Sequence, residues 1–467
     1  MEQLKTLEYV DKEFESHIIP TLMEYIKIDN LSLNFDPEWN TNGKLEKAAN
    51  LLLEWVFKQN VSGLKGEVMK MENMSPIIFL EIESNGGKGN TFMYGHFDKQ
   101  PHFEGWLEGT GPCKPVIIGD LLYGRGGADD GYAIFSSVLT IKALQTFGVK
   151  HGKFTVVIEG SEESGSPHLF PYLDKLNDKI GVPDLMVCLD SGCKDYERLW
   201  ITTSLRGMCM KDVTVECMKD SIHSGVGTGH APDSFTVIRQ LLDRLEDSKT
   251  GKVNDKLQVK IPESKYEEGK KVVDILGKGF CMCKMEDGVE LLTQDPLELY
   301  LNGTWRSTLC VVGQTGLPRH DLAGNVLRSK TSVRLSMRLP PSKDPKEASK
   351  EVSEILLKDP PYNSKITVED KSSGPGWACK DFSKKLTSSF EESSQKLWKN
   401  SFATVGEGGS IPFINGLANQ YPNAEFIVMG VLGPGSNAHA ANETLHIPYC
   451  KKVTTTLIHC VYDYFNN

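Results

Sequence analysis

Apolar and polar residues follow two different patterns along this chain, and the change between them lies near Arg206. Before that point, stretches with helical periodicity alternate with short apolar runs. The apolar residues between Leu45 and Val56 recur at helical spacing, with charged and amide residues between them. We therefore predict that about the first 60 residues are mostly helical.

Four short runs in the same part of the chain have the pattern of buried strands. Each is four to six residues long, mostly apolar and bounded by Gly, Asn or Asp: Ile77–Ile82, Thr91–Tyr94, Phe154–Ile158 and Leu185–Leu189. Such runs are typical of strands in a parallel or mixed sheet. A helix is predicted between them, at Ala133–Phe147. Strands and helices in alternation indicate an α/β fold.

From Met208 to about Pro341 the strands alternate between apolar and polar residues. Val333, Leu335 and Met337 are separated by polar residues, which predicts a sheet with one face in solvent. Helices are predicted at Val237–Leu245 and Glu347–Leu357.

A boundary is predicted at Ser372–Trp377, which contains two glycines and a proline, and Ala424–Val431 afterwards forms another apolar strand. The fold class we predict is therefore α/β, a mixed-sheet domain with a smaller α+β domain inserted into it. The larger domain comprises residues 1–207 and 373–467, and the inserted domain comprises residues 208–372.

Composition narrows the possible partners and locations. The chain has 467 residues and a net charge of −10, which argues against nucleic acid and anionic membranes as partners. No apolar run is long enough to span a membrane, and Met1–Ile19 lacks the apolar core of a secretory signal. Eleven cysteines form an odd count without a disulfide framework. They favour reduced thiols, so we expect a cytoplasmic protein.

Five segments place His, Asp or Glu at or soon after the end of an apolar run. The residues are His96, Asp98, Asp129, Asp130, Glu162, Glu163, Asp190 and His439. Taken singly, each has an ordinary alternative as a structural histidine, a solvated glutamate or a helix cap. Strand ends are where α/β folds place ligand sites, and buried carboxylates are costly unless they are paired or bind metal. Together the five segments predict a metal site, in which Asp98 orients His96.

The segments resemble a metallopeptidase family that includes carnosinases, cytosolic non-specific dipeptidases, glutamate carboxypeptidases, and acetylornithine and succinyl-diaminopimelate deacylases. The dipeptidase branch is most similar, through GHFDKQP, GWLEGTGPCKPV, LYGRGGADDG, EGSEESGS, HSGVGTG and GEGGSIP. This resemblance extends from about Leu51 to the C-terminus. It implies a catalytic domain of the zinc-peptidase type, formed by residues 1–207 and 373–467, and an inserted lid domain that also forms a homodimer.

The resemblance also implies two divalent metal ions per subunit, with zinc first and manganese or cobalt as alternatives. It assigns His96 and Asp190 to one ion, Glu163 and His439 to the other, and Asp129 to both. A water bound by the two ions would attack the substrate.

The remaining catalytic assignments follow from the same resemblance. Glu162 is the general base that activates the water, with an ordinary surface glutamate as the alternative, and Asp98 orients the neighbouring histidine. The peptide bond between Asp129 and Asp130 is expected to be cis.

Four substrate-binding residues and a further catalytic histidine are implied in the same way. His223 would reach the partner subunit's site and stabilise the oxyanion, or it is a histidine of a local turn. Ser410 and Gly409 match the loop that holds the substrate's terminal carboxylate, and Arg338 matches a lid-strand arginine. Glu407 would receive the substrate's amino group. Arg338 and Glu407 have solvated, structural roles as alternatives.

Three hypotheses about function remain open. The first is a dipeptidase that cleaves small peptides, and the second is a deacylase that acts on N-acyl amino acids. The same metal centre serves both reactions, so the pocket decides between them. Gly131 replaces a lysine of many dipeptidases, and the loop HSGVGTG is less bulky than theirs, which leaves the substrate open. The third hypothesis, a non-catalytic scaffold, is disfavoured because every predicted ligand and the base are present.

Overall fold

The structure is a computed structural model that describes residues 2–283 and 285–466. The chain divides into two compact units. The first unit comprises Met1–Thr202, Cys379–Thr404 and Gly416–Asn467, and the second comprises Thr203–Ala378 and Val405–Asn415. The catalytic and lid roles expected for the two parts stay predictions.

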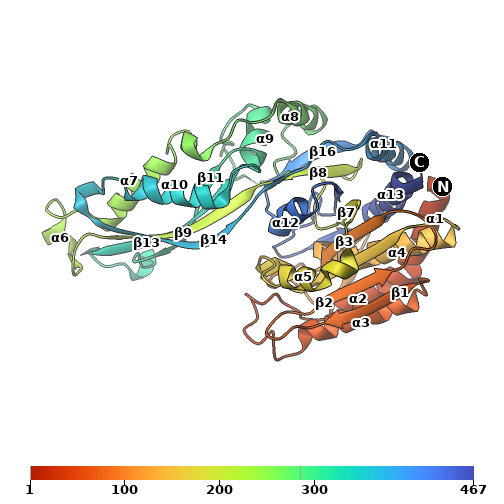
Figure 1. Cartoon of the computed structure of the whole chain (residues 1–467). Coiled ribbons are helices and arrows are strands. Elements are labelled where there is room, and N and C mark those ends of the chain that lie inside the picture. The colour runs from red at the N-terminus through yellow and green to blue at the C-terminus, as the bar shows by residue number, and fades with distance from the viewer. Residues whose placement is uncertain (1, 284, 467) are drawn as a thin grey trace. The chain divides into compact units, whose positions relative to one another are not determined.

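A six-stranded mixed sheet forms the centre of the first unit (Figure 1). Its order is β1 (Leu64–Met69), β2 (Ile77–Ile82), β6 (Lys153–Glu159), β3 (Asn90–His96), β7 (Leu185–Cys188) and β17 (Glu425–Val428). The strands β6, β3, β7 and β17 run parallel to one another, whereas β2 pairs antiparallel with both β1 and β6. The predicted α/β class with a mixed sheet is confirmed.

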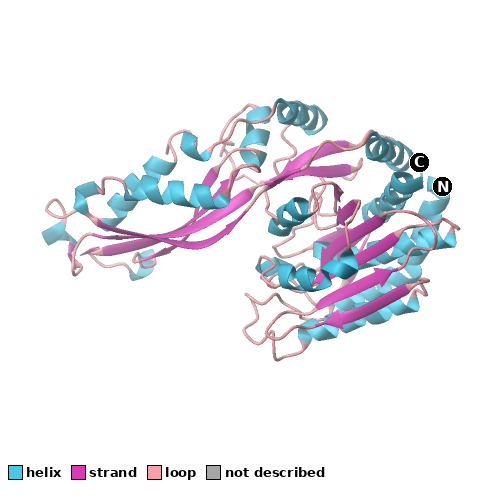
Figure 2. Ribbon diagram, in the orientation of Figure 1, coloured by secondary structure: helices cyan, strands magenta, loops and turns pink. Residues whose placement is uncertain are grey.

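Helices cover this sheet, as Figure 2 shows. They are α1 (Gln3–Glu13), α2 (Ile19–Ile26), α3 (Lys44–Lys58), α4 (Tyr132–Thr146), α5 (Leu169–Ile180), α11 (Lys384–Trp398) and α13 (Ile447–Asn466). α4 is apolar almost all round and buried, because it packs against β3 and β6 on one side and α13 on the other. A small sheet of β4 (Val116–Ile118), β5 (Leu121–Tyr123) and β18 (Thr444–His446) completes this unit.

Two predicted segments differ from the structure. The strand expected at Ala424–Val431 spans only Glu425–Val428, because its pairing with β7 ends at Val428. Beyond it the backbone of Gly430 passes so close to Ser191 that a side chain would not fit. The boundary expected at Ser372–Trp377 begins inside a strand, β14 (Lys365–Gly374). The strand continues there because its residues still pair with β9 (Gly207–Glu216).

The second unit contains a four-stranded antiparallel sheet in the order β11 (Thr308–Thr315), β13 (Lys330–Leu339), β9 and β14. Val333, Leu335 and Met337 are buried, and the residues between them are more exposed, as the alternation predicts. The helices α7 (Ser234–Leu245) and α10 (Pro345–Leu357) pack on the buried face.

Both helices begin earlier than predicted because of their caps. The side chains of Asp233 and Asp344 accept hydrogen bonds from the first free backbone N–H groups. Such caps stabilise a helix start by about 0.5–2 kcal/mol. The apolar periodicity begins only after these polar first turns, so it places the helix start too late.

Shorter elements complete the second unit. They are α6 (Ser224–Gly227), α8 (Glu263–Leu276), α9 (Pro296–Thr304) and the two-stranded pair β10 (Ile222–His223) and β12 (Val326–Leu327). Three elements cross or adjoin the division between the units: β8 (Trp200–Leu205), β16 (Ala403–Glu407) and α12 (Pro412–Gln420). Across the described residues, we find no helix with the length and apolar composition needed to cross a membrane.

Candidate metal centre

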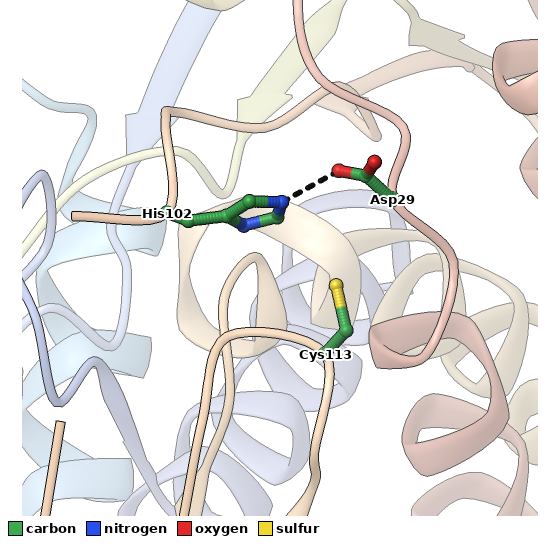
Figure 3. Close-up of side chains that lie close together, drawn as sticks. All are labelled: Asp29, His102 and Cys113. Atoms are coloured by element: carbon green, nitrogen blue, oxygen red, sulfur yellow. Dashed lines mark ion pairs between the residues drawn. The ribbon is translucent and has the colours of Figure 1, made fainter. Parts of the chain in front are cut away.

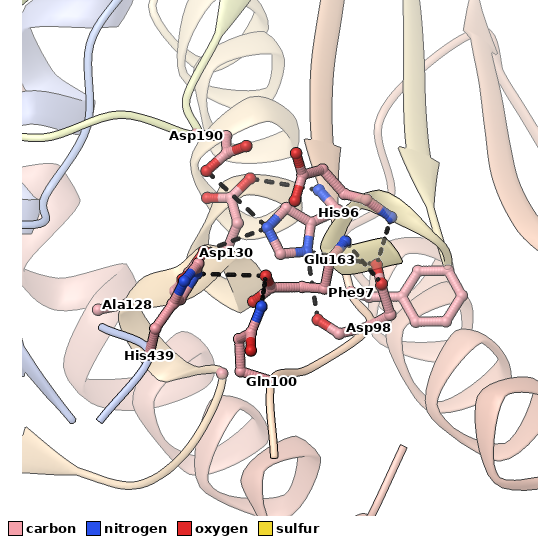
Figure 4. Close-up of polar contacts among 12 residues, drawn as sticks. His96, Phe97, Asp98, Gln100, Ala128, Asp130, Glu163, Asp190 and His439 are labelled. Atoms are coloured by element: carbon pink, nitrogen blue, oxygen red, sulfur yellow. Dashed lines mark hydrogen bonds and ion pairs between the residues drawn. The ribbon is translucent and has the colours of Figure 1, made fainter. Parts of the chain in front are cut away.

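The acidic residues and histidines predicted from the sequence gather at one edge of the first unit's sheet. The strands β3, β6 and β7 are parallel, so their carboxyl ends meet at this edge. His96 is the last residue of β3, Glu163 follows the end of β6, and Asp190 follows the end of β7. Figure 4 shows their side chains directed toward one another. Chain direction alone therefore brings together residues that are nearly a hundred positions apart.

Two further members come from loops. Asp129 lies in the turn 127–131 directly before α4, and the peptide bond between Asp129 and Asp130 is cis, as predicted. His439 lies between β17 and β18 with a φ of +58°, a conformation that His adopts more readily than most residues. Its side chain is 56% exposed, whereas that of His96 is fully buried.

The ligand atoms form two groups that share Asp129. In the first group, Nε2 of His96 lies 3.2 Å from Oδ1 of Asp129 and 3.9 Å from Oδ1 of Asp190. In the second, Nε2 of His439 lies 3.0 Å from Oδ2 of Asp129 and 3.2 Å from Oε2 of Glu163. Within each group the candidate ligand atoms all lie within 4.8 Å of one another. Each carboxylate oxygen of Asp129 thus faces a different group.

Asp98 connects the two strand ends that carry His96 and Glu163. Its carboxylate lies 3.4 Å from Nδ1 of His96, and its backbone carbonyl lies 3.2 Å from the same nitrogen. The same carboxylate accepts hydrogen bonds from the backbone N–H groups of Glu162 and Glu163, at 3.1 and 3.0 Å. Asp98 is fully buried, so these contacts hold the imidazole and the glutamate backbone in fixed relative positions.

Other polar residues that the sequence left without a role support the centre. Gln100 donates to Oε2 of Glu163 at 2.6 Å, and the backbone N–H of His96 donates to Asp130 at 3.2 Å. Glu443 accepts from the backbone N–H groups of the 126–129 turn and pairs with Arg125 at 2.7 Å. Glu443 follows His439 by four residues in the loop before β18.

The centre concentrates negative charge in a buried place. Burial raises the pKa of Asp190 to about 6 and that of Glu163 to about 7. Burial and then the charge of Asp190 raise the pKa of Glu162 well above its ordinary value. Burial alone would lower the pKa of His439, but its hydrogen bonds with Asp129 and Glu163 raise it to about 11. Burial therefore disfavours the ionised form of these carboxylates, and a cation beside them would favour it.

The donor set fits divalent metal ions. Oε1 of Glu163 and Oδ1 of Asp130 are buried atoms without a hydrogen-bond partner in the structure. A buried carboxylate oxygen without a partner is costly, and a cation supplies the partner. Imidazole nitrogen and carboxylate oxygen are ligands of zinc, and also of manganese and cobalt. The residues present therefore suit two cations that share one carboxylate.

A second polar cluster lies in the second unit and has the opposite charge. Nη1 of Arg338 donates to Oγ of Ser410 at 2.9 Å, and this hydroxyl donates to the backbone carbonyl of Arg206 at 2.5 Å. Arg206 also donates through Nε to the carbonyl of Gly408 at 3.1 Å. Burial and then the charge of Arg338 lower the pKa of Arg206 to about 10. The structure therefore adds Arg206 to a cluster in which only Arg338 and Ser410 were predicted.

Of the other residues predicted for substrate binding, Gly409 joins this cluster, because its backbone carbonyl accepts the backbone N–H of Arg206 at 3.0 Å. Gly409 is exposed, with open space where a side chain would stand, and Glu407 is half-buried at the end of β16. His223 is exposed in β10, and its Nδ1 accepts the backbone N–H of Gly225 at 3.1 Å.

Sequence comparison relates most of the chain to known peptidases. Residues 92–463 match the model described as peptidase family M20/M25/M40. The chain is 26% identical over 374 residues to a cysteinylglycine-S-conjugate dipeptidase of Corynebacterium striatum, covering 78% of each protein. It is 25% identical over 400 residues to the Cys-Gly metallodipeptidase DUG1 of Saccharomyces cerevisiae, covering 82% of each.

Solved structures show the same fold. Human carnosine dipeptidase 1 superimposes with a TM-score of 0.77 at 19% identity, covering 100% of this chain and 99% of the other. The dipeptidase Dug1p from Saccharomyces cerevisiae superimposes with a TM-score of 0.77 at 21% identity, with the same coverage.

Proposed function

Since the chain belongs to peptidase family M20/M25/M40, we propose that it hydrolyses the peptide bond of dipeptides and other short peptides in a metal-dependent reaction. The predicted resemblance to metallopeptidases of the dipeptidase branch is confirmed by the family match and by the dipeptidases among the relatives. The single observation that carries the proposal is the pair of ligand groups that share Asp129.

The ligand groups support a site for two divalent ions per subunit. In this proposal His96 and Asp190 hold one ion, Glu163 and His439 hold the other, and Asp129 holds both. We propose zinc first, with manganese or cobalt as alternatives, because nitrogen and carboxylate ligands accept all three. Bound ions of this kind polarise a carbonyl and lower the pKa of water.

Glu162 is proposed to move the proton. It is adjacent to Glu163 but belongs to neither ligand group among the described residues. The water oxygen bonds to the carbonyl carbon while Glu162 accepts the water's proton. The carbon–nitrogen bond then breaks, and Glu162 returns the proton to the leaving nitrogen. Asp98 holds the backbone of Glu162 in place for both transfers.

The cationic cluster of the second unit is proposed to bind the substrate's terminal carboxylate. Arg338 supplies charge, Ser410 supplies a hydroxyl, and Gly409 leaves room for the ligand. Charge-assisted hydrogen bonds to a carboxylate are about twice as strong as neutral ones. Glu407 is proposed to receive the amino group at the other end of a dipeptide.

A homodimer is proposed, in which His223 donates a hydrogen bond to the oxyanion in the partner subunit's site. The support is the exposure of His223 and an open sheet edge in the same unit. The edge strand β11 exposes the side chains of Val311 and Val312, at 44% and 53%. Exposed apolar edges of this kind are suited to pairing with another chain. We also propose a cytoplasmic location, on the composition of the cysteines.

A substrate panel tests the proposed activity. The zinc-loaded protein is given a library of dipeptides and, in parallel, a set of N-acetyl amino acids, and released free amino acids are measured. We expect release from dipeptides. Release from the acetylated set alone would identify a deacylase, which shares the metal centre. A protein that binds metal yet releases nothing from either set would support the scaffold hypothesis.

Mixed dimers test the role of His223. Glu162→Ala lacks the proton carrier, and His223→Ala lacks the oxyanion donor, so each alone should be inactive. If His223 acts in the partner subunit, half of the sites in each mixed dimer contain both groups. After subunit exchange at equal amounts, about a quarter of the wild-type activity should return. No recovery would place His223 within its own chain, and an active His223→Ala homodimer would make it structural.

A further inference from the structure

A second kind of metal-ligating cluster lies in the first unit, formed by Asp29, His102 and Cys113 (Figure 3). One ligand atom from each residue lies within 4.8 Å of the others. Asp29 follows the end of α2, and the other two residues lie on the segment between β3 and β4. None of the three belongs to the groups that share Asp129.

The contacts of the cluster occupy both oxygens of Asp29 and leave one nitrogen of His102 without a partner in the structure. Nε2 of His102 lies 2.7 Å from Oδ1 of Asp29, and Nζ of Lys44 lies 2.7 Å from the other carboxylate oxygen. Nδ1 of His102 is a buried atom without a hydrogen-bond partner in the structure. Each of the three side chains is partly buried, so the cluster is not a set of freely solvated surface groups.

We propose that Asp29, His102 and Cys113 form a third metal site, which takes a divalent cation with affinity for thiolate, zinc above all. Zinc is bound in proteins by cysteine sulfur, histidine nitrogen and carboxylate oxygen, with four ligands in a tetrahedron. Three protein ligands leave one position for water. The sulfur ligand distinguishes this site chemically from the catalytic groups, whose ligands are oxygen and nitrogen. Soft thiolate selects zinc over manganese.

Both carboxylates and lysines adjoin the cluster, and the charge of Lys99 acts on the Cys113 thiol. Lys44 pairs with Asp29 and lies 4.0 Å from Asp36, so its single positive charge is shared between two carboxylates. Burial raises the pKa of the Cys113 thiol, which is therefore protonated without a cation. A bound divalent ion would displace this proton, as metals do with coordinating thiols.

A cation bound at this site would stabilise the position of the segment between β3 and β4, which begins at the edge of the sheet that carries the metal centre. This segment begins with Asp98 and Gln100, which support the ligands of the metal centre. Lys99 already ties it to the end of α2 by donating to the backbone carbonyls of Tyr25, Ile26 and Ile28. A cation held by Asp29, His102 and Cys113 adds a second tie between the same two pieces of chain.

Cobalt substitution tests the proposal without any measurement of activity. The full-length protein is stripped with a chelator, reloaded with Co²⁺, and its absorption spectrum is recorded. Thiolate bound to Co²⁺ gives a charge-transfer band in the near ultraviolet, whereas the catalytic groups contain no sulfur. We expect this band in the wild type and its loss in Cys113→Ser. After reloading with zinc, Cys113→Ser should retain one metal equivalent less than the wild type.

Cys281→Ser/Cys283→Ser is the matched control, because it removes two thiols of the second unit that lie two positions apart, and it should keep the band. The absence of the band from the wild type, or its persistence in Cys113→Ser, would overturn the proposal. If Cys113→Ser does not fold, X-ray absorption on the zinc-loaded control variant decides the question. A sulfur scatterer at about 2.3 Å from zinc supports the site, and nitrogen and oxygen scatterers alone contradict it.

Discussion

The metal centre of the first unit and the arginine cluster of the second unit carry opposite charges, and both place charged side chains in buried surroundings. In the first, carboxylates surround two histidines, and burial raises the pKa of Asp190 and Glu163. In the second, two arginines approach the same hydroxyl and loop, and burial lowers the pKa of Arg206 and Arg338. In each cluster burial disfavours the charged form of these side chains, and a ligand of the opposite sign is proposed for each. Perturbed groups of this kind mark candidate functional sites, and the proposal assigns cations to the first cluster and the substrate carboxylate to the second.

Removing the cations from the metal centre should have the largest effect on activity. Treatment with a chelator should reduce dipeptide hydrolysis to background, because the acidic centre then has no ligand of opposite charge. Adding zinc, manganese or cobalt should restore the rate, as measured by released amino acids. Full activity in protein shown by elemental analysis to be free of metal would contradict the proposed role of the centre.

The next largest effect is expected from Glu162→Gln. Loss of the proton carrier should lower kcat by about 10²–10⁴-fold, while the metal content stays at the wild-type level. Glu163→Gln is the matched control, since it changes the neighbouring residue and should lose metal as well as activity. Elemental analysis beside the rate measurement separates the two. If Glu162→Gln lost metal and Glu163→Gln kept it, the two roles would be exchanged.

Arg338→Ala changes the arginine cluster of the second unit and should have a smaller effect on activity. Removing a charge-assisted contact to the substrate carboxylate should cost about 1.5–3 kcal/mol, a roughly 10- to 150-fold loss in kcat/KM. Most of the loss should lie in KM, because a carboxylate remote from the reacting bond is held in both ground and transition states. A dipeptide with an amidated C-terminus should lose little on this substitution. Equal losses for both substrates would assign Arg338 a structural role.

The smallest effect is expected from Arg334→Ala, on the same strand. Arg334 pairs with Asp212 at 2.7 Å and is 47% exposed, and a pair in solvent contributes about 0–1 kcal/mol. The free energy of unfolding should change by less than about 1 kcal/mol, as measured by denaturant titration, with KM unchanged. A rise in KM similar to that of Arg338→Ala would mean that any positive charge on this strand serves the substrate.

Much of the fold could be predicted because its signals are local. The continuous apolar runs of β2, β3 and β6 and the alternation of β13 each arise from which faces of a strand are buried. Element ends were less predictable, since Asp233 and Asp344 act as caps through side-chain hydrogen bonds that lie outside the apolar periodicity.

The ligand residues could be singled out for the same local reason. His96, Glu163 and Asp190 each stand at or just after a strand end, where parallel strands place their ligands. Which carboxylate oxygen of Asp129 faces which histidine could not be predicted, because it depends on the turn before α4 and on a loop more than 300 residues away. The roles carried over from the family resemblance stay predictions.

By itself, the sequence determined the alternation of apolar and polar positions, the strand ends, and the charged residues placed there. Only the tertiary structure decided that Asp98 accepts from both glutamate N–H groups, and that Arg206 joins Arg338. It alone brought Asp29 to His102 and Cys113. The physical reason is the distance along the chain over which each feature is determined. Periodicity is set by neighbours along the chain, whereas a hydrogen bond between distant residues exists only after packing has fixed where each segment lies.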